Sequence, residues 1–370
     1  MKVAIISSHT PALLRFRMDM MLFFKSIGHE VYALGNENEE KWEKFFAEIG
    51  IKYLQIKVNR NEVNPFNDIK TIFSIKKTLT KIKPDKIFLF QAKTVIYGSI
   101  AANSIGVTEV YPIIAGIGSV FTNNDIKTRI IRKTVIAEYR YALRKSPAVF
   151  FQNTDDKAVF QKYGIIKNQK TVLLHGSGVN TERFPVQPFP KQFAFLCVSR
   201  LIRDKGIYEY LEACKKIKEK YPSVRCMLVG EFDSNPTALK PGDLKSFTDN
   251  GIIEYFGEQE DVRPYLAQCS VFILPSYYRE GTPKAVLEAM STGRPVITTD
   301  SVGCRETVRD GENGFLVPVK DVDAICKCME QFINNKHLTE TMGAKGRQMA
   351  ENIFDVRDVN KCIAETMGLR

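Results

Sequence analysis

The segment FAFLCVSRLIRDKGIYEYLEACKKIKEK, residues 193–220, contains the unit that recurs along this chain. Residues 193–199 form an apolar run of the kind found in parallel strands buried on both faces. A charged loop follows, and residues 206–220 have the pattern of a helix. The segment therefore predicts one strand–helix unit of an α/β sheet.

The same alternation runs through all 370 residues. The predicted strands are residues 3–7, 31–34, 51–58, 87–90, 110–114, 148–151, 172–174, 193–199, 224–229, 252–256, 271–274 and 296–298. The predicted helices are residues 13–27, 67–83, 95–104, 127–144, 154–163, 206–220, 283–292, 322–334, 338–352 and 356–367. Strands that alternate with helices form parallel sheets, so we expect an α/β protein with two doubly wound domains.

The domain boundary is predicted at a proline-rich stretch. Residues 184–190 read FPVQPFP, and three prolines in so short a stretch favour a stiff, extended segment. We expect an N-terminal domain at 1–184, a linker at 185–191 and a C-terminal domain at 192–352. The last helix, at about 353–370, is expected to pack back on the first domain.

The charge of the chain is uneven. The net charge is +11, but residues 1–190 hold 28 basic and 16 acidic residues, whereas residues 191–370 hold 25 and 26. This asymmetry indicates an anionic partner for the first half: nucleic acid, anionic lipid or a phosphorylated substrate. The alternative is a surface tuned for solubility. With 44% hydrophobic residues, a disulfide miniprotein and a wholly disordered chain are excluded.

The cysteines and the N-terminus bear on the compartment. All eight cysteines lie in the second half and none forms a C-x-x-C pair, which favours a reducing cytosol. The first residues, MKVAIIS, are too short and too soon polar for a signal peptide. No stretch reaches 18 apolar residues, so we expect no membrane span.

Two clusters of polar residues follow predicted strands, where ligands bind in open α/β sheets. In the first, Arg200, Arg203 and Lys205 bring cations to the start of a helix, which favours an anion site; a solvated loop is the alternative. In the second, Glu280 precedes a helix start and Glu288 lies eight residues on, among apolar neighbours. A carboxylate in that setting needs a partner, although two incidental glutamates are the alternative.

These clusters belong to an ordered set of motifs. The set reads S-R-L-x-x-x-K-G from Ser199, L-V-G from Leu228, L-P-S-x(3)-E-G-x-P-x-x-x-L-E-A from Leu274, then G-x-P-V-I, G-C-R-E and G-x-N-G-x-L-V. In order and spacing it resembles the retaining glycosyltransferase family 4. The resemblance implies the GT-B fold, in which two Rossmann-like domains face each other across a cleft.

The resemblance also implies roles for residues of the second half, which would bind a nucleotide-sugar donor. Arg200 and Lys205 would bind the donor diphosphate, and Glu280, with the Gly281 and Thr282 amides, would bind the sugar hydroxyls. Arg200, Lys205 and Glu280 are the predicted catalytic residues.

Further donor contacts are implied at four positions. Glu288 would bind the ribose, Glu231 would lie near the base, and the turn at Gly303 and Cys304 would approach the phosphates. No metal or other cofactor is expected, because Arg200 and helix amides can stabilise the leaving diphosphate. The D-x-D spelling at Asp321–Asp323 opens a predicted helix near the C-terminus instead.

The first half resembles a narrower group. Its motifs are Phe16-Arg17-Met18, Asn64-Pro65-Phe66, Tyr97-Gly98-Ser99 and Gly116-Ile117-Gly118-Ser119. Members of this PglA-type group move N-acetylgalactosamine or another hexose or N-acetylhexosamine from a UDP-sugar to a polyprenyl-diphosphate-linked sugar, in bacterial surface glycan or protein-glycosylation assembly.

The acceptor side departs from the pattern at two places. Residues 7–11 read SSHTP where many relatives have paired glycines, and Gln91-Ala92-Lys93-Thr94 stands where many have a histidine. The acceptor-side candidates are His9, Arg15, Arg17, Lys93, Gly116, Gly118 and Ser119. For His9, an ordinary loop or core histidine is the alternative reading.

Two basic amphipathic helices are predicted at 67–83 and 127–145. Helices of this kind lie on anionic bilayers, although each could simply pack on the sheet with its charges in water. With a lipid-linked acceptor, they predict a peripheral enzyme on the cytoplasmic face of the inner membrane.

Two functions other than sugar transfer are compatible with parts of the sequence. A UDP-sugar 2-epimerase can share the two-domain cleft but transfers nothing to an acceptor. A nucleic-acid-binding protein is suggested by basicity alone, and the sequence has no zinc-finger or helix-turn-helix signature, so no nucleic-acid partner is expected.

Overall fold

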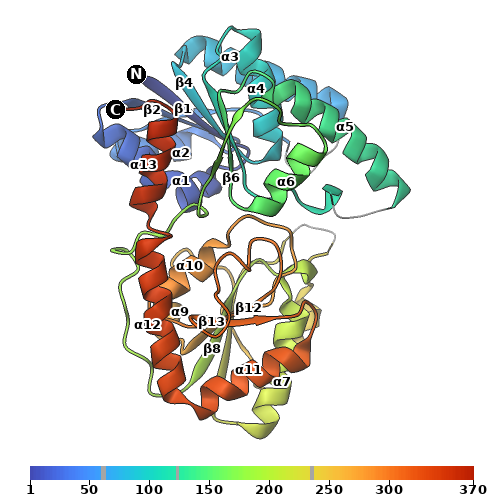
Figure 1. Cartoon of the computed structure of the whole chain (residues 1–370), viewed down its shortest axis with the longest axis vertical. Coiled ribbons are helices and arrows are strands. Elements are labelled where there is room, and N and C mark those ends of the chain that lie inside the picture. The colour runs from blue at the N-terminus through green and yellow to red at the C-terminus, as the bar shows by residue number, and fades with distance from the viewer. Residues whose placement is uncertain (60–63, 122–124, 234–236) are drawn as a thin grey trace. The chain divides into compact units, whose positions relative to one another are not determined.

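A computed structural model of the chain describes residues 1–59, 64–121, 125–233 and 237–370. The chain forms two compact units. The first consists of residues 1–177 and 356–370, and the second of residues 178–355. Figure 1 shows that each unit is built around a sheet with helices on its faces.

The sheet of the first unit has seven strands in the order β3-β2-β1-β4-β5-β6-β7. The strands are β1 (Lys2–Ser7), β2 (Glu30–Gly35), β3 (Lys52–Gln55), β4 (Lys86–Phe90), β5 (Val110–Ile114), β6 (Ala148–Phe151) and β7 (Lys170–Leu173). Every pairing is parallel. All strands therefore end at one edge of the sheet, and the loops that follow them gather there.

Helices cover both faces of this sheet, as the alternating side chains of β1 require. Val3 and Ile5 belong to one apolar cluster, and Ala4 and Ile6 to another. The first cluster is covered by α1 (Thr10–Ser26), α2 (Glu39–Glu48) and the last helix, α13 (Val356–Thr366), which contacts α1. The second is covered by α3 (Pro65–Ile82), α4 (Ala92–Ser104), α5 (Ile126–Leu143) and α6 (Thr154–Lys162).

The second unit has a parallel sheet of six strands, in the order β10-β9-β8-β11-β12-β13. The strands are β8 (Ala194–Val198), β9 (Arg225–Val229), β10 (Glu254–Tyr255), β11 (Val271–Leu274), β12 (Val296–Thr299) and β13 (Gly314–Val317). Its helices are α7 (Ile207–Lys220), α8 (Pro241–Asp249), α9 (Arg263–Ala267), α10 (Lys284–Ser291), α11 (Val322–Asn334) and α12 (Lys336–Asn352).

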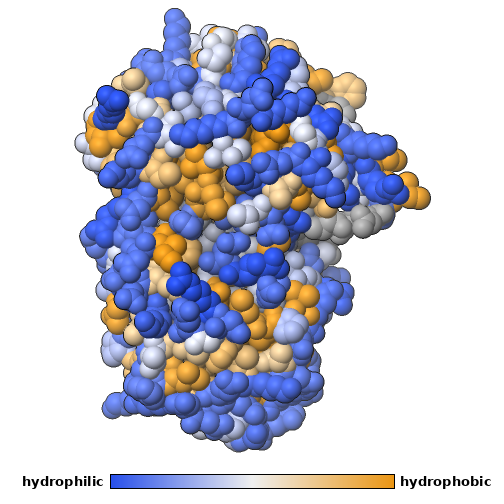
Figure 2. Space-filling model, viewed as in Figure 1, coloured by the Kyte–Doolittle hydropathy of each residue, from blue (hydrophilic) through white to orange (hydrophobic). Residues whose placement is uncertain are grey.

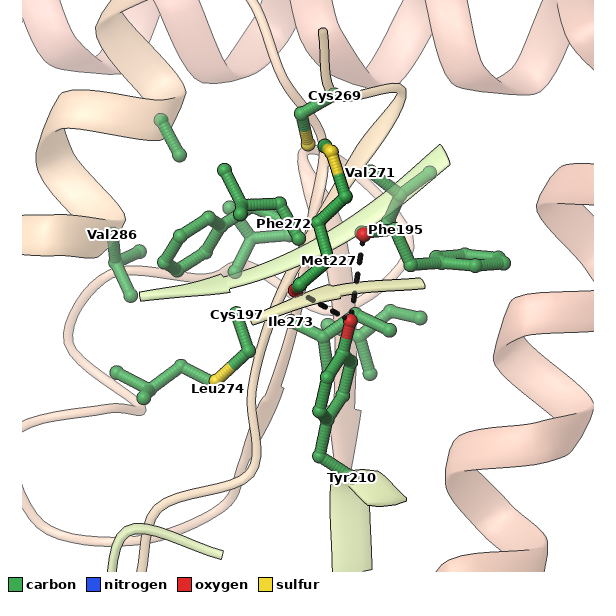
Figure 3. Packing of buried hydrophobic residues seen from close by; sticks show 14 of the residues in the cluster. Phe195, Cys197, Tyr210, Met227, Cys269, Val271, Phe272, Ile273, Leu274 and Val286 are labelled. Carbon is green, nitrogen blue, oxygen red and sulfur yellow. Dashed lines mark hydrogen bonds between the residues drawn. The ribbon is translucent and has the colours of Figure 1, made fainter. Parts of the chain in front are cut away.

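The core of this unit includes one polar group whose hydrogen bonds are internal. The Tyr210 hydroxyl on α7 lies 2.9 Å from the carbonyl oxygen of Met227 on β9 and 3.4 Å from that of Phe195 on β8 (Figure 3). Burial raises the pKa of this tyrosine well above its ordinary value. The neutral hydroxyl therefore stays a donor at physiological pH and fixes α7 on the sheet.

The architecture confirms the predicted fold class, but the boundary between units differs from the prediction. The predicted first domain ends at residue 184, whereas the first unit ends at Ser177, and residues 185–191 belong to the second unit. The reason is a set of hydrogen bonds to this segment. The Gln187 amide donates to the Thr292 carbonyl at 3.2 Å, and Arg294 donates to the Pro188 carbonyl at 2.8 Å.

Among the residues that the structure describes, no helix combines the length and the apolar composition needed to cross a bilayer.

Candidate functional site

The loops after four neighbouring strands meet at one edge of the second sheet. Arg200 follows β8, Asp233 follows β9, Glu280 lies in the loop after β11, and Gly303 lies in the loop after β12. These strands are adjacent in the order β9-β8-β11-β12 and all run in parallel. The edge therefore brings together residues that are up to 103 positions apart in the sequence.

Lys205 and Glu280 form the most buried ion pair of this edge. Lys205 Nζ lies 2.5 Å from Glu280 Oε1, and the two side chains are only 10% and 18% exposed. The Ser276 hydroxyl donates to the same carboxylate oxygen at 3.1 Å. An ion pair this far from water depends strongly on its partners, because removing either one leaves a buried charge.

Arg200 is held by a second carboxylate. Its NH1 group lies 2.7 Å from Asp233 Oδ2. Burial lowers the pKa of Arg200, but the hydrogen bond and charge of Asp233 outweigh burial, so the pKa is raised. The Tyr278 ring lies 5.8 Å from the Arg200 guanidinium carbon and 5.5 Å from Lys205 Nζ. Arg200 and Lys205 are thus two cations that share one aromatic neighbour.

Two motif glycines explain how these loops come so close. A Cβ at Gly206 would lie 2.0 Å from the carbonyl oxygen of Pro275, and one at Gly303 would lie 2.3 Å from that of Gly281. Both glycines also have positive φ, of 73° and 87°. Any side chain at either position would push the loops apart.

Hydrogen bonds from residues at the end of β12 and after it also hold the loop after β11. The Ser276 carbonyl accepts hydrogen bonds from Thr299, from Ser301 at 2.7 Å and, weakly, from the Cys304 thiol at 3.8 Å. Burial and then the charge of Glu280 raise the pKa of Cys304, so this thiol is neutral and part of the packing.

The remaining predicted donor residues lie at the same edge or beside it. Gly281 and Thr282 are buried directly before α10, and Glu288 is half-buried within that helix. Glu231 is half-buried after β9, and its carbonyl accepts from the Leu201 amide at 2.9 Å. Their contacts with a donor stay predictions.

Arg203, the third cation of the first cluster, is placed differently. It is exposed, and its guanidinium lies 5.9 Å from the ring of Tyr208. The structure therefore brings Arg200 and Lys205 together beside Tyr278 and directs Arg203 to another aromatic side chain.

In the first unit, His9 also lies at a carboxyl edge. Its Nδ1 atom is 2.7 Å from Glu37 Oε1, and the Thr10 amide donates to Glu37 Oε2 at 2.6 Å. Burial alone would raise the pKa of Glu37. The hydrogen bonds from His9 and Thr10 outweigh burial and lower the pKa to about 2. The carboxylate therefore stays ionised and fixes both His9 and the start of α1.

Gln91 lies at the same edge, directly after β4, in a backbone conformation that is rare for a residue with a side chain. Its φ is 77°. Its side-chain oxygen accepts from the Ser7 hydroxyl at 2.9 Å, from the Ser8 amide at 2.9 Å and from the Ser8 hydroxyl at 2.6 Å. Such strain costs on the order of 1–3 kcal/mol and is concentrated at functional sites.

Arg17 is buried on α1 and is only 1% exposed. None of its three side-chain nitrogens has a hydrogen-bond partner in the described part of the chain. Its guanidinium lies 4.8 Å from the ring of Phe90 and 5.3 Å from that of Phe88. Burial lowers its pKa to about 9. The aromatic faces thus supply the attraction for this cation.

The other acceptor-side candidates are more scattered. Lys93 on α4 forms an ion pair with Asp68 on α3 at 2.9 Å, and Arg15 is exposed on α1. Gly116 and Gly118 follow β5, both with positive φ, and Ser119 starts a short 3₁₀ turn. Nothing is described of the Ser119 side chain.

Four residues beyond those predicted take part in these arrangements: Asp233, Ser276, Glu37 and Gln91. Asp233 and Glu37 each lie a few residues after a strand. In both cases that strand is adjacent in the sheet to the strand that precedes the basic partner. The sequence shows a carboxylate shortly after each of these two predicted strands, but the strand pairing that brings it to its partner is seen only in the structure. In the described residues, no three His, Cys, Asp or Glu side chains are grouped as around a metal ion.

Two family models match the chain: "Glycosyl transferase 4-like" over residues 2–153 and "Glycosyl transferases group 1" over residues 192–335. The chain belongs to glycosyltransferase family 4. This glycosyltransferase is similar to a Campylobacter jejuni protein named N,N'-diacetylbacillosaminyl-diphospho-undecaprenol alpha-1,3-N-acetylgalactosaminyltransferase. The two are 24% identical over 375 residues, which cover 96% of this chain and 97% of the relative.

A second relative and a solved structure agree with this family. The Escherichia coli protein named UDP-Gal:alpha-D-GlcNAc-diphosphoundecaprenol alpha-1,3-galactosyltransferase is 27% identical over 312 residues, covering 80% of the glycosyltransferase and 78% of the relative. The Anabaena protein Alr3699/HepE, solved in complex with UDP, covers 100% of both chains with a TM-score of 0.79 and 18% identity. The chain is thus a GT-B glycosyltransferase, and the epimerase alternative finds no support.

Proposed function

We propose that this enzyme transfers a sugar, N-acetylgalactosamine or another hexose or N-acetylhexosamine, from a UDP-sugar to a polyprenyl-diphosphate-linked sugar. The proposal is carried by one arrangement: Arg200 and the Lys205–Glu280 pair at the carboxyl edge of the second sheet. The names of the Campylobacter and E. coli relatives support the acceptor class, and the UDP complex of the Anabaena protein supports the donor.

The chemistry asks for charge stabilisation at the donor. As the bond between the anomeric carbon and the diphosphate oxygen breaks, negative charge grows on the diphosphate. Arg200 and Lys205 attract that charge, while Glu280 orients the sugar by accepting hydrogen bonds from its hydroxyls. The acceptor hydroxyl attacks the same face of the sugar, and its proton passes to the departing phosphate oxygen. The anomeric configuration is then retained, and these cations perform the role without a bound metal.

The acceptor diphosphate is assigned to the basic first unit. His9, fixed by Glu37, and Gln91, fixed by Ser7 and Ser8, lie after the adjacent strands β1 and β4. We place the acceptor sugar against these two side chains. Their orientation is set by hydrogen bonds before any substrate binds, which is what a positioning role requires.

The test is a panel of UDP-sugars with a synthetic polyprenyl-diphosphate-sugar acceptor. We expect one UDP-sugar to be consumed, the product to keep the α configuration of the donor by NMR, and chelator to leave the rate unchanged. An inverted product would contradict the retaining mechanism. Epimerised UDP-sugar without acceptor would contradict the transferase itself.

We further propose that α3 and α5 bring the enzyme to the anionic cytoplasmic surface of the inner membrane. On α3, Phe66, Ile69 and Phe73 are 78%, 51% and 65% exposed at helical spacing. On α5, Ile126 and Ile130 are 77% and 63% exposed. Figure 2 shows apolar side chains gathered at the N-terminal end of α5, beside hydrophilic ones. Apolar side chains that enter the headgroup region, with lysines around them, favour such binding.

Flotation with phosphatidylglycerol vesicles at low salt tests this surface. We expect wild-type enzyme to bind and Ile69→Ser/Phe73→Ser to lose most of its binding. Leu22→Ser/Phe45→Ser is the matched control, because these side chains, 39% and 38% exposed, lie on other helices of the same unit. Wild-type enzyme that stays unbound would overturn the membrane proposal while leaving the transferase proposal intact.

A further inference from the structure

The first unit contains a basic pocket away from the edge described above. It has a volume of about 720 Å³ and is lined by residues of two segments, 140–147 and 164–169. The first segment contains the last residues of α5 and the loop to β6, and the second precedes β7. Both segments therefore lie at the amino ends of parallel strands, opposite to the edge that holds His9 and Gln91.

The charge of this pocket has one sign. Arg140, Arg144, Lys145 and Lys167 line it, and none of its lining residues, all of them described, is acidic. Arg140 is engaged in the wall itself, since its guanidinium donates to the Tyr163 carbonyl through Nε at 3.1 Å and through a second nitrogen. The positive charge of the other three side chains is available to a ligand.

Arg144 is held in place without a carboxylate. Its guanidinium carbon lies 4.2 Å from the ring of Tyr141, one helical turn before it. Stacking of this kind orients an arginine and leaves its hydrogen-bond donors free for a planar or tetrahedral anion.

A buried hydroxyl lies in the same lining. Ser146 is only 6% exposed, and its Oγ atom has no hydrogen-bond partner in the described part of the chain. Buried polar atoms in folded proteins are normally hydrogen-bonded, so an anion bound in this pocket would give the Ser146 hydroxyl an acceptor. A phosphate oxygen accepts charge-assisted hydrogen bonds from arginine and lysine, and it also accepts a bond from a neutral hydroxyl within reach.

The end of α5 does not need these cations as caps. The Leu143 carbonyl already accepts from the Ser146 amide and from Gln169 Nε2, each at 3.0 Å. Favourable interaction of an exposed charge with the helix dipole typically contributes about 0.3–1 kcal/mol. Capping alone therefore does not account for three cations and an unpartnered hydroxyl around one pocket.

We propose that this pocket binds a multivalent phosphate-bearing anion, with Arg144, Lys145 and Lys167 as its cations and Ser146 as a neutral donor. Such an anion has two sources, a free diphosphate or the headgroups of an anionic phospholipid. Because the pocket lies at the amino edge of the sheet, it is a second anion site, separate from the proposed acceptor position. It does not depend on the identity of the transferred sugar.

The experiment measures pyrophosphate binding by calorimetry with UDP present at saturation, so that the donor site is filled. Arg144→Gln/Lys145→Gln/Lys167→Gln should weaken binding at least tenfold, and Ser146→Ala two- to fivefold. The control Lys41→Gln/Lys44→Gln/Lys57→Gln removes the same charge from exposed lysines of the same unit and should stay within twofold. A second arm repeats the comparison by flotation on phosphatidylglycerol and phosphatidylcholine vesicles.

The two arms separate the sources of the anion. If the pocket variant loses affinity for pyrophosphate, the result supports the site and identifies a soluble ligand. Loss confined to phosphatidylglycerol vesicles supports the site and identifies a lipid headgroup. The proposal is overturned if the pocket variant and the control variant lose equal pyrophosphate affinity and equal vesicle binding. It is also overturned if the pocket variant binds both as well as the wild type does. Thermal unfolding of each variant, expected within a few degrees of wild type, confirms that the comparison is between folded proteins.

Discussion

The carboxyl edges of the two sheets handle charge in different ways. At the edge of the second sheet each important cation has its own carboxylate, Arg200 with Asp233 and Lys205 with Glu280. At the edge of the first sheet the frame is a histidine–glutamate pair and a strained glutamine. The surplus lysines and arginines of that unit lie elsewhere, on α3, on α5 and around the basic pocket.

This difference teaches what net charge measures. The half of the chain that is expected to bind the nucleotide diphosphate is close to neutral, and carboxylates hold Arg200 and Lys205 in position there. In the basic half, the excess positive charge is spread over a wide surface. Charge distributed in this way attracts an anionic partner without binding it in one fixed geometry. A specific anion site thus depends on two cations that carboxylates hold in position. A surface that attracts anions depends on many exposed cations without such partners.

The largest effect is expected for Arg200→Ala. Removing one preorganised donor to a developing charge lowers turnover by about 10²–10³-fold. The matched variant is Arg203→Ala, which removes an exposed cation that lies over Tyr208. It should keep turnover within about twofold, measured with saturating acceptor. Equal losses of turnover in both variants would mean that the loop needs positive charge in general and not Arg200 in particular.

A double-mutant cycle on Lys205 and Glu280 tests whether the pair acts as a unit. Lys205→Met leaves a largely buried carboxylate and should lower the free energy of unfolding by about 3–5 kcal/mol. Lys205→Met/Glu280→Gln removes both charges and should recover part of that loss. Urea titration of the four proteins gives the coupling. Strictly additive losses would contradict a direct ion pair.

Gly303→Ala tests the contact between the loops after β11 and β12. Its new methyl group would lie 2.3 Å from a carbonyl oxygen, so we expect a loss of about 2–3 kcal/mol and a tenfold lower kcat/KM. Gly311→Ala is the control, because Gly311 also has a positive φ, of 77°, but a Cβ placed there would have no neighbouring atom within 4 Å. It should lose only about 1 kcal/mol and keep its kcat/KM. Activity that is unchanged in both variants would separate the loop contact from catalysis.

A smaller effect is expected at Glu37, on the other edge. Its folded-state pKa of about 2 lies below the ordinary value of 4.5, so its stabilisation is fully present above about pH 4.5. That stabilisation is lost as the pH falls towards 2. Glu37→Gln should therefore cost about 1–2 kcal/mol at pH 7, after screening, and flatten the acid limb of the stability curve. A variant whose pH profile matches the wild type would contradict the bond to His9.

Much of the fold was predictable because both sheets are parallel and buried. Strands such as β1 and β11 are short apolar runs that no other element resembles. The helix α2 was missed because only Phe46 of it is buried within the helix, so no apolar stripe marks it. The helix α9 has five residues, too few for any periodicity. The strand β13 begins with a glycine and only two of its four residues are buried, so it lacks the continuous buried run of β11. The strand predicted at 252–256 is reduced to two residues at the sheet edge.

The candidate site was predictable to the extent that its residues fall after strands. Arg200, Lys205 and Glu280 could be selected in this way, but their partners could not. Asp233 is 33 residues from Arg200 in sequence, and only the β8–β9 pairing brings them together. The pair of Lys93 with Asp68 joins two helices, and contacts between helix faces leave no mark on local sequence.

The most direct test of the account is the affinity for UDP and for UMP, measured by calorimetry on wild-type enzyme and on Arg200→Ala. If Arg200 and Lys205 hold the donor diphosphate, wild-type enzyme binds UDP at least tenfold more tightly than UMP, and the variant loses most of that preference. A variant that still prefers UDP by the same factor would show that the second phosphate is held elsewhere and would contradict the account.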